Sequence, residues 1–125
     1  MDPRGLTALV VEDDADLRYQ FRIALTIAGY RVREAADGYQ ALIAVEQYAP
    51  DVIVLDLGLP RVNGFSVLDE LAARPGDRGP AVVVVTGLDG VQRDDVIVLR
   101  KPVDPATLVA GVRSALRRSA NGLQT

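Results

Sequence analysis

A single acidic residue, Asp56, follows an unbroken apolar run and offers a carboxylate for chemistry. The run, residues 52–55, is bounded by Pro50 on one side and by a loop rich in Pro, Asn and Gly on the other. Such a run is typical of a strand that is buried on both faces of a sheet. Ligands of open parallel sheets bind beyond the carboxyl ends of the strands. From this stretch alone, Asp56 either begins a turn or acts in such a site.

Four further candidate residues lie at or just after the ends of other apolar runs: Glu12, Asp13, Thr86 and Lys101. Carboxylates are favoured at the start of a helix, which explains the nearby Asp14 and Asp16. Capping explains Glu12 and Asp13 poorly, because they still belong to the strand end and add like-charge repulsion. These five residues together point to a site, although Lys101 and Thr86 taken singly could be ordinary strand-end residues.

Three carboxylates that converge without a cationic partner repel one another unless a hard divalent cation neutralises them. Mg²⁺ fits Glu12, Asp13 and Asp56, since it favours one or two carboxylates together with waters and a phosphate oxygen. A metal beside Asp56 would allow that carboxylate to attack a phosphoryl donor, with Lys101 helping to balance the charge. Thr86 supplies a hydroxyl that can bond to a phosphoryl oxygen.

Composition narrows the possible chemistry and location. The chain has 125 residues and is 49% apolar, which fits one domain with one core. It contains no Cys or His, which excludes a phosphohistidine on this chain and a Cys/His metal site. A net charge of −3 argues against direct nucleic acid binding by this domain. No apolar run approaches the roughly 18 residues of a membrane span. We therefore expect a cytoplasmic protein with no membrane contact.

The apolar patterns predict alternating strands and helices. Strands are expected at 6–11, 30–35, 52–55, 81–85 and 96–99, and helices at 15–28, at 37–48, after Asn63-Gly64 and from Pro105 onward. Residues 30–35 alternate between polar and apolar, as an edge strand does. The prediction is an α/β fold, a flavodoxin-like three-layer sandwich with a five-stranded parallel sheet in the order 2-1-3-4-5. All five candidate residues then share one edge of that sheet.

Four segments, V-V-E-D-D, D-L-G-L-P-R-V-N-G, V-V-V-V-T-G and L-R-K-P, resemble in order the signature segments of CheY-like receiver domains of two-component response regulators. The resemblance covers nearly the whole chain, with a receiver domain at 1–119 and a frayed tail at 120–125. It implies a cis Lys101-Pro102 bond.

The resemblance also implies roles for the candidate residues. Asp56 would accept a phosphoryl group from a sensor histidine kinase or a histidine phosphotransfer protein, and Thr86 and Lys101 would recognise the phosphorylated state. Mg²⁺ would bind Glu12, Asp13, Asp56 and the backbone carbonyl of Gly58. Such a domain is not an enzyme: it assists its own phosphotransfer and slow dephosphorylation, and it signals to a downstream protein target.

Two features depart from the family pattern. Only nine residues, Gly87 to Asp95, separate Thr86 from the last strand, where receivers normally have a full helix. An average helix takes about 11 residues, and this Gly-containing segment has little helical periodicity, so we expect the fourth helix to be short or absent and the segment to make few core contacts. Val98, three residues before Lys101, stands where most receivers carry a Tyr or Phe switch residue.

Rival classes of protein fit less well. A flavodoxin-type cofactor binder needs a phosphate-cradling loop after the first strand, where E-D-D-A-D would repel phosphate. The P-loop motif does not occur. A haloacid-dehalogenase-like phosphatase would carry a second acid two residues after Asp56, where this chain has Gly58. The remaining alternative is a receiver-like interaction module that is never phosphorylated.

Overall fold

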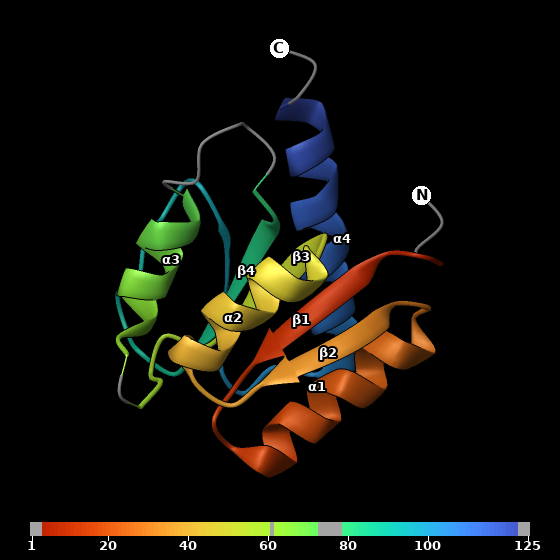
Figure 1. Ribbon diagram of the computed structural model, residues 1–125. Helices are drawn as coiled ribbons and strands as arrows, with labels where there is room; N and C mark the ends of the chain where they lie inside the picture. The colour runs from red at the N-terminus through yellow and green to blue at the C-terminus, as the bar shows by residue number, and fades with distance from the viewer. Residues whose placement is uncertain (1–3, 61, 73–78, 123–125) are drawn as a thin grey trace.

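A parallel sheet of five strands forms the centre of the computed structural model, which describes residues 4–60, 62–72 and 79–122 (Figure 1). The strands are β1 (Thr7–Val11), β2 (Arg31–Ala35), β3 (Val52–Leu55), β4 (Ala81–Thr86) and β5 (Ile97–Arg100). The helices are α1 (Ala15–Ile27), α2 (Gly38–Tyr48), α3 (Gly64–Ala72) and α4 (Pro105–Gly122). The sheet order is β2-β1-β3-β4-β5 and every pairing is parallel, which confirms the predicted topology.

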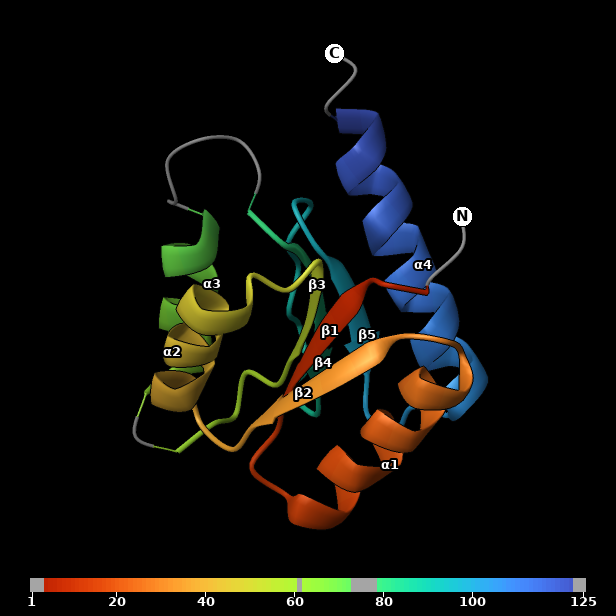
Figure 2. The same cartoon turned by 45° about the vertical axis from the view of Figure 1, so that its right-hand side comes forward.

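Helices cover both faces of the sheet, so that the molecule has three layers (Figure 2). α1 and α4 lie on one face, where Phe21, Leu25 and Leu108 belong to the first apolar cluster. α2 and α3 lie on the other, where Leu68 and Val45 belong to the second. All four residues of β3 are at most 1% exposed, as expected for a strand between two helical layers.

Aspartates begin three of the helices. Asp14 accepts hydrogen bonds from the backbone N–H groups of Asp16 and Leu17, and Asp37 accepts one from Gln40. Asp104 accepts a hydrogen bond from the N–H of Thr107 in the first turn of α4. Each cap satisfies donors that have no partner within the helix. Asp14 is thus the N-cap of α1, in agreement with its expected place at the start of the first helix.

The predicted strands and helices agree with the observed ones to within a residue or two at most ends. The last helix is the exception, because α4 continues through Gly122, beyond the expected domain end at residue 119. The rest of the expected tail, residues 123–125, lies outside the described residues, and the division of the chain at residue 119 stays a prediction. The Lys101-Pro102 bond is cis, as the resemblance implied.

Residues 87–96, which connect β4 to β5, contain no helix, so the expectation that the family's fourth helix is short or absent is confirmed. The expectation of few core contacts is wrong for the second half of this segment. Val91 is partly buried against the α2 and α3 side of the sheet, and Val96, which was expected to begin the last strand, is buried. Arg93 forms ion pairs with Asp69 of α3 and with Asp95. The first half, residues 87–90, is exposed throughout.

Candidate functional site

Two acids follow the carboxyl end of β1, one of them buried and the other exposed to solvent. Glu12 is 1% exposed, and its N–H donates to Ala35 O at 3.1 Å, which continues the β1–β2 ladder by one residue. Its Oε2 accepts a hydrogen bond of 3.2 Å from the N–H of Asp14. Asp13 is exposed, and among the described residues no hydrogen bond or ion pair holds its side chain. Asp13 is therefore available to a ligand from solvent.

Asp56 follows β3 at the same edge of the sheet and is 6% exposed. Its N–H donates to Val11 O at 3.1 Å, which ties the residue to β1. Asp56 Oδ1 accepts a hydrogen bond of 3.0 Å from the N–H of Gly58. The backbone thus fixes one carboxylate oxygen, and the residue lies at the edge of the sheet beyond which open parallel sheets bind their ligands.

Lys101, after β5, reaches across to two of these acids. Its Nζ lies 2.7 Å from Glu12 Oε1 and 3.2 Å from Asp56 Oδ2. Burial alone would lower the pKa of Lys101, but the hydrogen bond and charge of Glu12, with the charge of Asp56, outweigh burial and raise that pKa. Burial raises the pKa of Glu12, and there the Lys101 contact does not compensate. The difference follows from depth, since the Lys101 side chain is 24% exposed and that of Glu12 only 2%.

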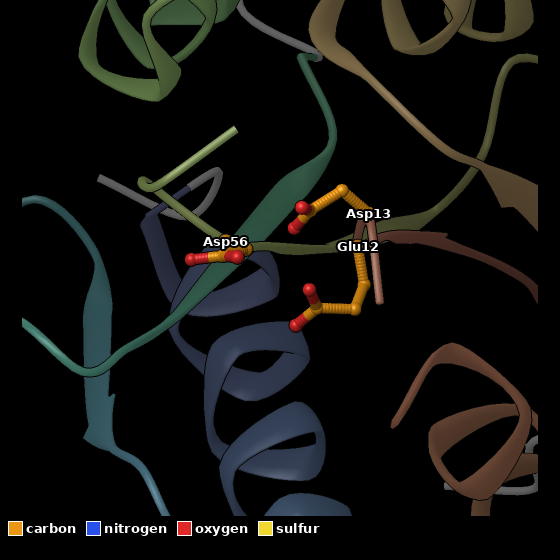
Figure 3. A group of neighbouring side chains, drawn as sticks. All are labelled: Glu12, Asp13 and Asp56. Atoms are coloured by element: carbon orange, nitrogen blue, oxygen red, sulfur yellow. The ribbon is translucent and has the colours of Figure 1, made fainter. Parts of the chain in front are cut away.

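Glu12, Asp13 and Asp56 form an acidic cluster in which one carboxylate oxygen from each lies within 4.8 Å of the others. Figure 3 shows the side chains of Glu12 and Asp13 extending from the end of β1 toward Asp56. The assumption that no cation lies among the three acids is wrong, because Lys101 contacts two of them. Three carboxylates still outnumber one ammonium. The oxygen ligands and the remaining negative charge suit a hard divalent cation.

Thr86 ends β4 beside this cluster and is 1% exposed. Its Oγ1 accepts a hydrogen bond of 3.0 Å from the N–H of Leu88, and its carbonyl accepts one of 2.8 Å from Lys101 N. The structure thus brings all the predicted side chains to one edge of the sheet. Gly58 is exposed beside Asp56, and the metal-binding role of its carbonyl stays a prediction.

Two residues important to this geometry were missed by the sequence analysis. An added Cβ on Gly64 would overlap Leu57 Cα and lie 2.8 Å from Asp56 O, so only glycine lets α3 approach the loop after β3 this closely. Arg18 donates from Nη1 to Glu12 O at 2.8 Å. The Asn63-Gly64 pair was noted only as a helix start. Nothing in the sequence around Arg18 marks it as different from other helical arginines.

Comparison with known proteins identifies the arrangement. The response regulator receiver domain matches residues 8–113, which is most of the chain. The chain belongs to this family.

The receiver is similar to several curated proteins and solved structures. It is 40% identical to the "DNA-binding response regulator MtrA" of Mycobacterium tuberculosis over 126 residues, covering 95% of this chain and 54% of MtrA. A putative response regulator from Chloroflexus aurantiacus has a TM-score of 0.82 at 28% identity, covering 90% of this chain and 98% of that one. CheY4 of Vibrio cholerae, a chemotaxis response regulator, has a TM-score of 0.80 at 25% identity, with coverages of 89% and 98%. The receiver spans about half the length of MtrA.

Membership of this family indicates the general function. Receiver domains belong to two-component systems, in which they partner with histidine kinases and downstream effectors. Among the described residues, no helix is long and apolar enough to cross a membrane.

Proposed function

We propose that the receiver takes a phosphoryl group onto Asp56 from the phosphohistidine of a sensor kinase or of a histidine phosphotransfer protein. The observation that carries the proposal is the setting of this carboxylate. Asp56 is nearly buried at the end of a central strand, one oxygen is held by Gly58 N–H, and the other faces the Lys101 ammonium. The chain contains no His, so the phosphohistidine belongs to a partner.

The transfer step exchanges one bond to phosphorus for another. A carboxylate oxygen of Asp56 forms a bond to the phosphorus atom, and the bond from phosphorus to the donor's imidazole nitrogen breaks with its electron pair left on that nitrogen. Lys101 provides a cation beside the attacking carboxylate. Thr86 is placed one strand away from β3, and its hydroxyl proton is available to a phosphoryl oxygen because its hydrogen bond with Leu88 uses only a lone pair.

Mg²⁺ is the metal we assign to Glu12, Asp13 and Asp56, with the carbonyl of Gly58 as a further ligand. When bound, Mg²⁺ would neutralise the negative charge of the transferring group. The protein's own part is to hold two acids at the end of β1 close to Asp56. Asp13 is the ligand that costs least to recruit, since no contact has to be broken to free it.

The receiver assists its own phosphorylation and dephosphorylation and is not an enzyme acting on other substrates. Its output is a contact with a downstream protein, and its low pI of about 4.8 argues against direct DNA contact by this domain. The rival proposal, an interaction module that is never phosphorylated, predicts no role for the acids beyond folding.

The test is phosphorylation by acetyl phosphate with Mg²⁺, followed by intact-protein mass spectrometry. We expect the mass gain of one phosphoryl group in the wild-type protein and none in Asp56→Asn. Asp51→Asn is the matched control, because Asp51 lies at the opposite end of β3 and, within the part of the chain that the structure describes, its carboxylate accepts one hydrogen bond, from the N–H of Thr7. A calorimetric Mg²⁺ titration should show binding that Asp13→Ala abolishes. An unmodified wild-type protein under these conditions would favour the unphosphorylated interaction module.

A further inference from the structure

Arg18 joins the edge strand β2 to the backbone just before Asp13. Its Nη1 donates to Glu12 O at 2.8 Å, and its Nε donates to Glu34 Oε1 at 3.0 Å. The Arg18 side chain is 21% exposed, and it connects α1 both to the end of β1 and to β2. A planar guanidinium can hold two such acceptors at once because its donors point in fixed directions.

The carbonyl that Arg18 holds belongs to the peptide bond between Glu12 and Asp13. That peptide unit is planar and contains the N and Cα atoms of Asp13, so fixing its oxygen fixes where the Asp13 side chain begins. The preceding peptide unit is fixed by Glu12 N–H donating to Ala35 O. Two consecutive peptide planes are therefore anchored, one by the sheet and one by Arg18. Asp13 has no side-chain anchor among the described residues and depends on this backbone.

Arg22 provides a natural comparison one turn later on α1. Its Nη1 lies 2.8 Å from Glu34 Oε2, so the two arginines bind the two oxygens of one carboxylate. Arg22 is 52% exposed, and neither Glu12 nor Asp13 is among its hydrogen-bond partners in the described residues. Replacing Arg22 therefore removes an ion pair to Glu34 and leaves the Glu12 carbonyl bond in place.

We propose that Arg18 is a positioning residue that orients the acid pair for its divalent cation by holding the Glu12 carbonyl. The inference rests on the metal assignment made under the proposed function. Groups that orient metal ligands from outside the coordination shell typically change metal affinity about 10- to 100-fold when they are removed. We expect an effect near the lower end, about tenfold, because the Arg18 bond orients the Asp13 carboxylate only through the backbone.

A purely electrostatic role for Arg18 predicts the opposite sign. Its positive charge repels a cation nearby, so losing that charge would tighten Mg²⁺ binding. Arg18→Met removes both the charge and the bond, whereas Arg18→Lys keeps the charge and loses the fork that bridges Glu12 O and Glu34. Under the positioning role both variants bind Mg²⁺ more weakly. Under the electrostatic role Arg18→Met binds more tightly and Arg18→Lys is unchanged.

The experiment compares wild-type protein, Arg18→Met, Arg18→Lys and the control Arg22→Met by calorimetric titration with Mg²⁺. Amide hydrogen exchange of Glu12 and Asp14 is measured on the same proteins without metal, since both amides are hydrogen-bonded at the end of β1. We expect both Arg18 variants to bind Mg²⁺ about tenfold more weakly and to exchange these two amides faster than Arg22→Met does. Arg22→Met should match the wild-type protein.

Unchanged or tighter Mg²⁺ binding in both Arg18 variants would overturn the positioning role. An equal loss in Arg22→Met would also overturn it, because the shared Glu34 ion pairs would then be responsible. A wild-type protein that does not bind Mg²⁺ would contradict the metal assignment, and the exchange rates would still decide whether Arg18 holds the end of β1.

Discussion

Lys101 lies closer to Glu12 than to Asp56, with Nζ 2.7 Å from Glu12 Oε1 and 3.2 Å from Asp56 Oδ2. The ammonium thus forms its shorter contact with the deeply buried acid and its longer one with the proposed phosphoacceptor. Without metal, Lys101 is the cation of this cluster among the described residues. A divalent cation bound by the acids would share Asp56 with the Lys101 ammonium.

Replacing Lys101 by Met should tighten Mg²⁺ binding and weaken the metal-free fold. The first effect follows because a cation competing for the same acids is gone. The second follows because Glu12 would be left buried without a charged partner, at a cost of about 1 to 3 kcal/mol in the free energy of unfolding. Calorimetry and urea unfolding measure the two effects. Weaker Mg²⁺ binding would show that Lys101 supports the metal site and does not compete with it.

Replacing Asp56 by Asn should raise the free energy of unfolding in metal-free buffer by on the order of 1 kcal/mol. The amide keeps an acceptor for Gly58 N–H and removes one charge from a cluster in which acids outnumber the ammonium. Lys101 keeps its shorter contact with Glu12. Urea unfolding with and without Mg²⁺ checks the prediction. A less stable variant would mean that the Lys101 attraction to Asp56 exceeds the repulsion between the acids.

Replacing Gly64 by Ala should destabilise the fold and disturb the phosphoacceptor loop. The added methyl would overlap Leu57 Cα and crowd the carbonyl oxygens of Asp56 and Leu57, both at 2.8 Å, and backbone cannot move aside as a side chain can. Overpacking of this kind costs about 1 to 3 kcal/mol or more. The control is Gly87→Ala, since a Cβ on Gly87 meets nothing within 4 Å. The midpoint of thermal unfolding and the extent of acetyl phosphate labelling should both fall in Gly64→Ala. Neither should fall in Gly87→Ala.

Lowering the pH should remove the contribution that Asp104 makes to stability by capping α4. The pKa of Asp104 is lowered from 3.8 because its carboxylate accepts a hydrogen bond from the N–H of Thr107. A carboxyl whose pKa is lowered in the folded state stabilises the fold at pH values above its pKa in the unfolded chain. For Asp104 this contribution disappears as the pH falls from 3.8 through the lower pKa of the folded state. Asp104→Asn, which still caps the helix but does not titrate there, should show a smaller loss of stability over that window. Identical pH profiles of urea unfolding would rule out the contribution of this cap.

Phosphorylation should alter the first half of the β4–β5 connection and leave the second half unchanged. Thr86 is linked to Leu88 N–H, so a movement of Thr86 toward a phosphoryl group is passed to exposed residues 87–90. Residues 91–96 are held by Val91, Val96 and the ion pairs of Arg93. With a beryllofluoride mimic we expect slower amide exchange at residues 87–90, as these residues become ordered for a partner. If amide exchange at residues 87–90 does not change and the mimic instead induces dimerisation through α4, the prediction fails. The receiver would then switch as ordinary members of its family do.

The sequence alone was enough to place the strands and the edge at which the site lies. Residues 52–55 are continuously apolar because β3 lies between two helical layers, and residues 30–35 alternate because β2 is an edge strand. Both signals are local, so a linear pattern can reveal them. Parallel strands then bring Glu12, Asp56 and Lys101 to one edge whatever the details of their side chains. The shortness of the segment after Thr86 likewise sufficed to exclude a full helix.

Contacts between distant elements were decided only by the tertiary structure. Lys101 is 89 residues from Glu12, and whether its ammonium reaches that acid depends on strand stagger and side-chain direction. Gly64 and Arg18 matter because of what lies a few ångströms away, which no pattern around either residue encodes. Val91 was expected to make few core contacts because the segment around it is polar and contains two glycines. It is partly buried because it packs against the apolar cluster on the α2 and α3 side of the sheet, which the local sequence does not reveal.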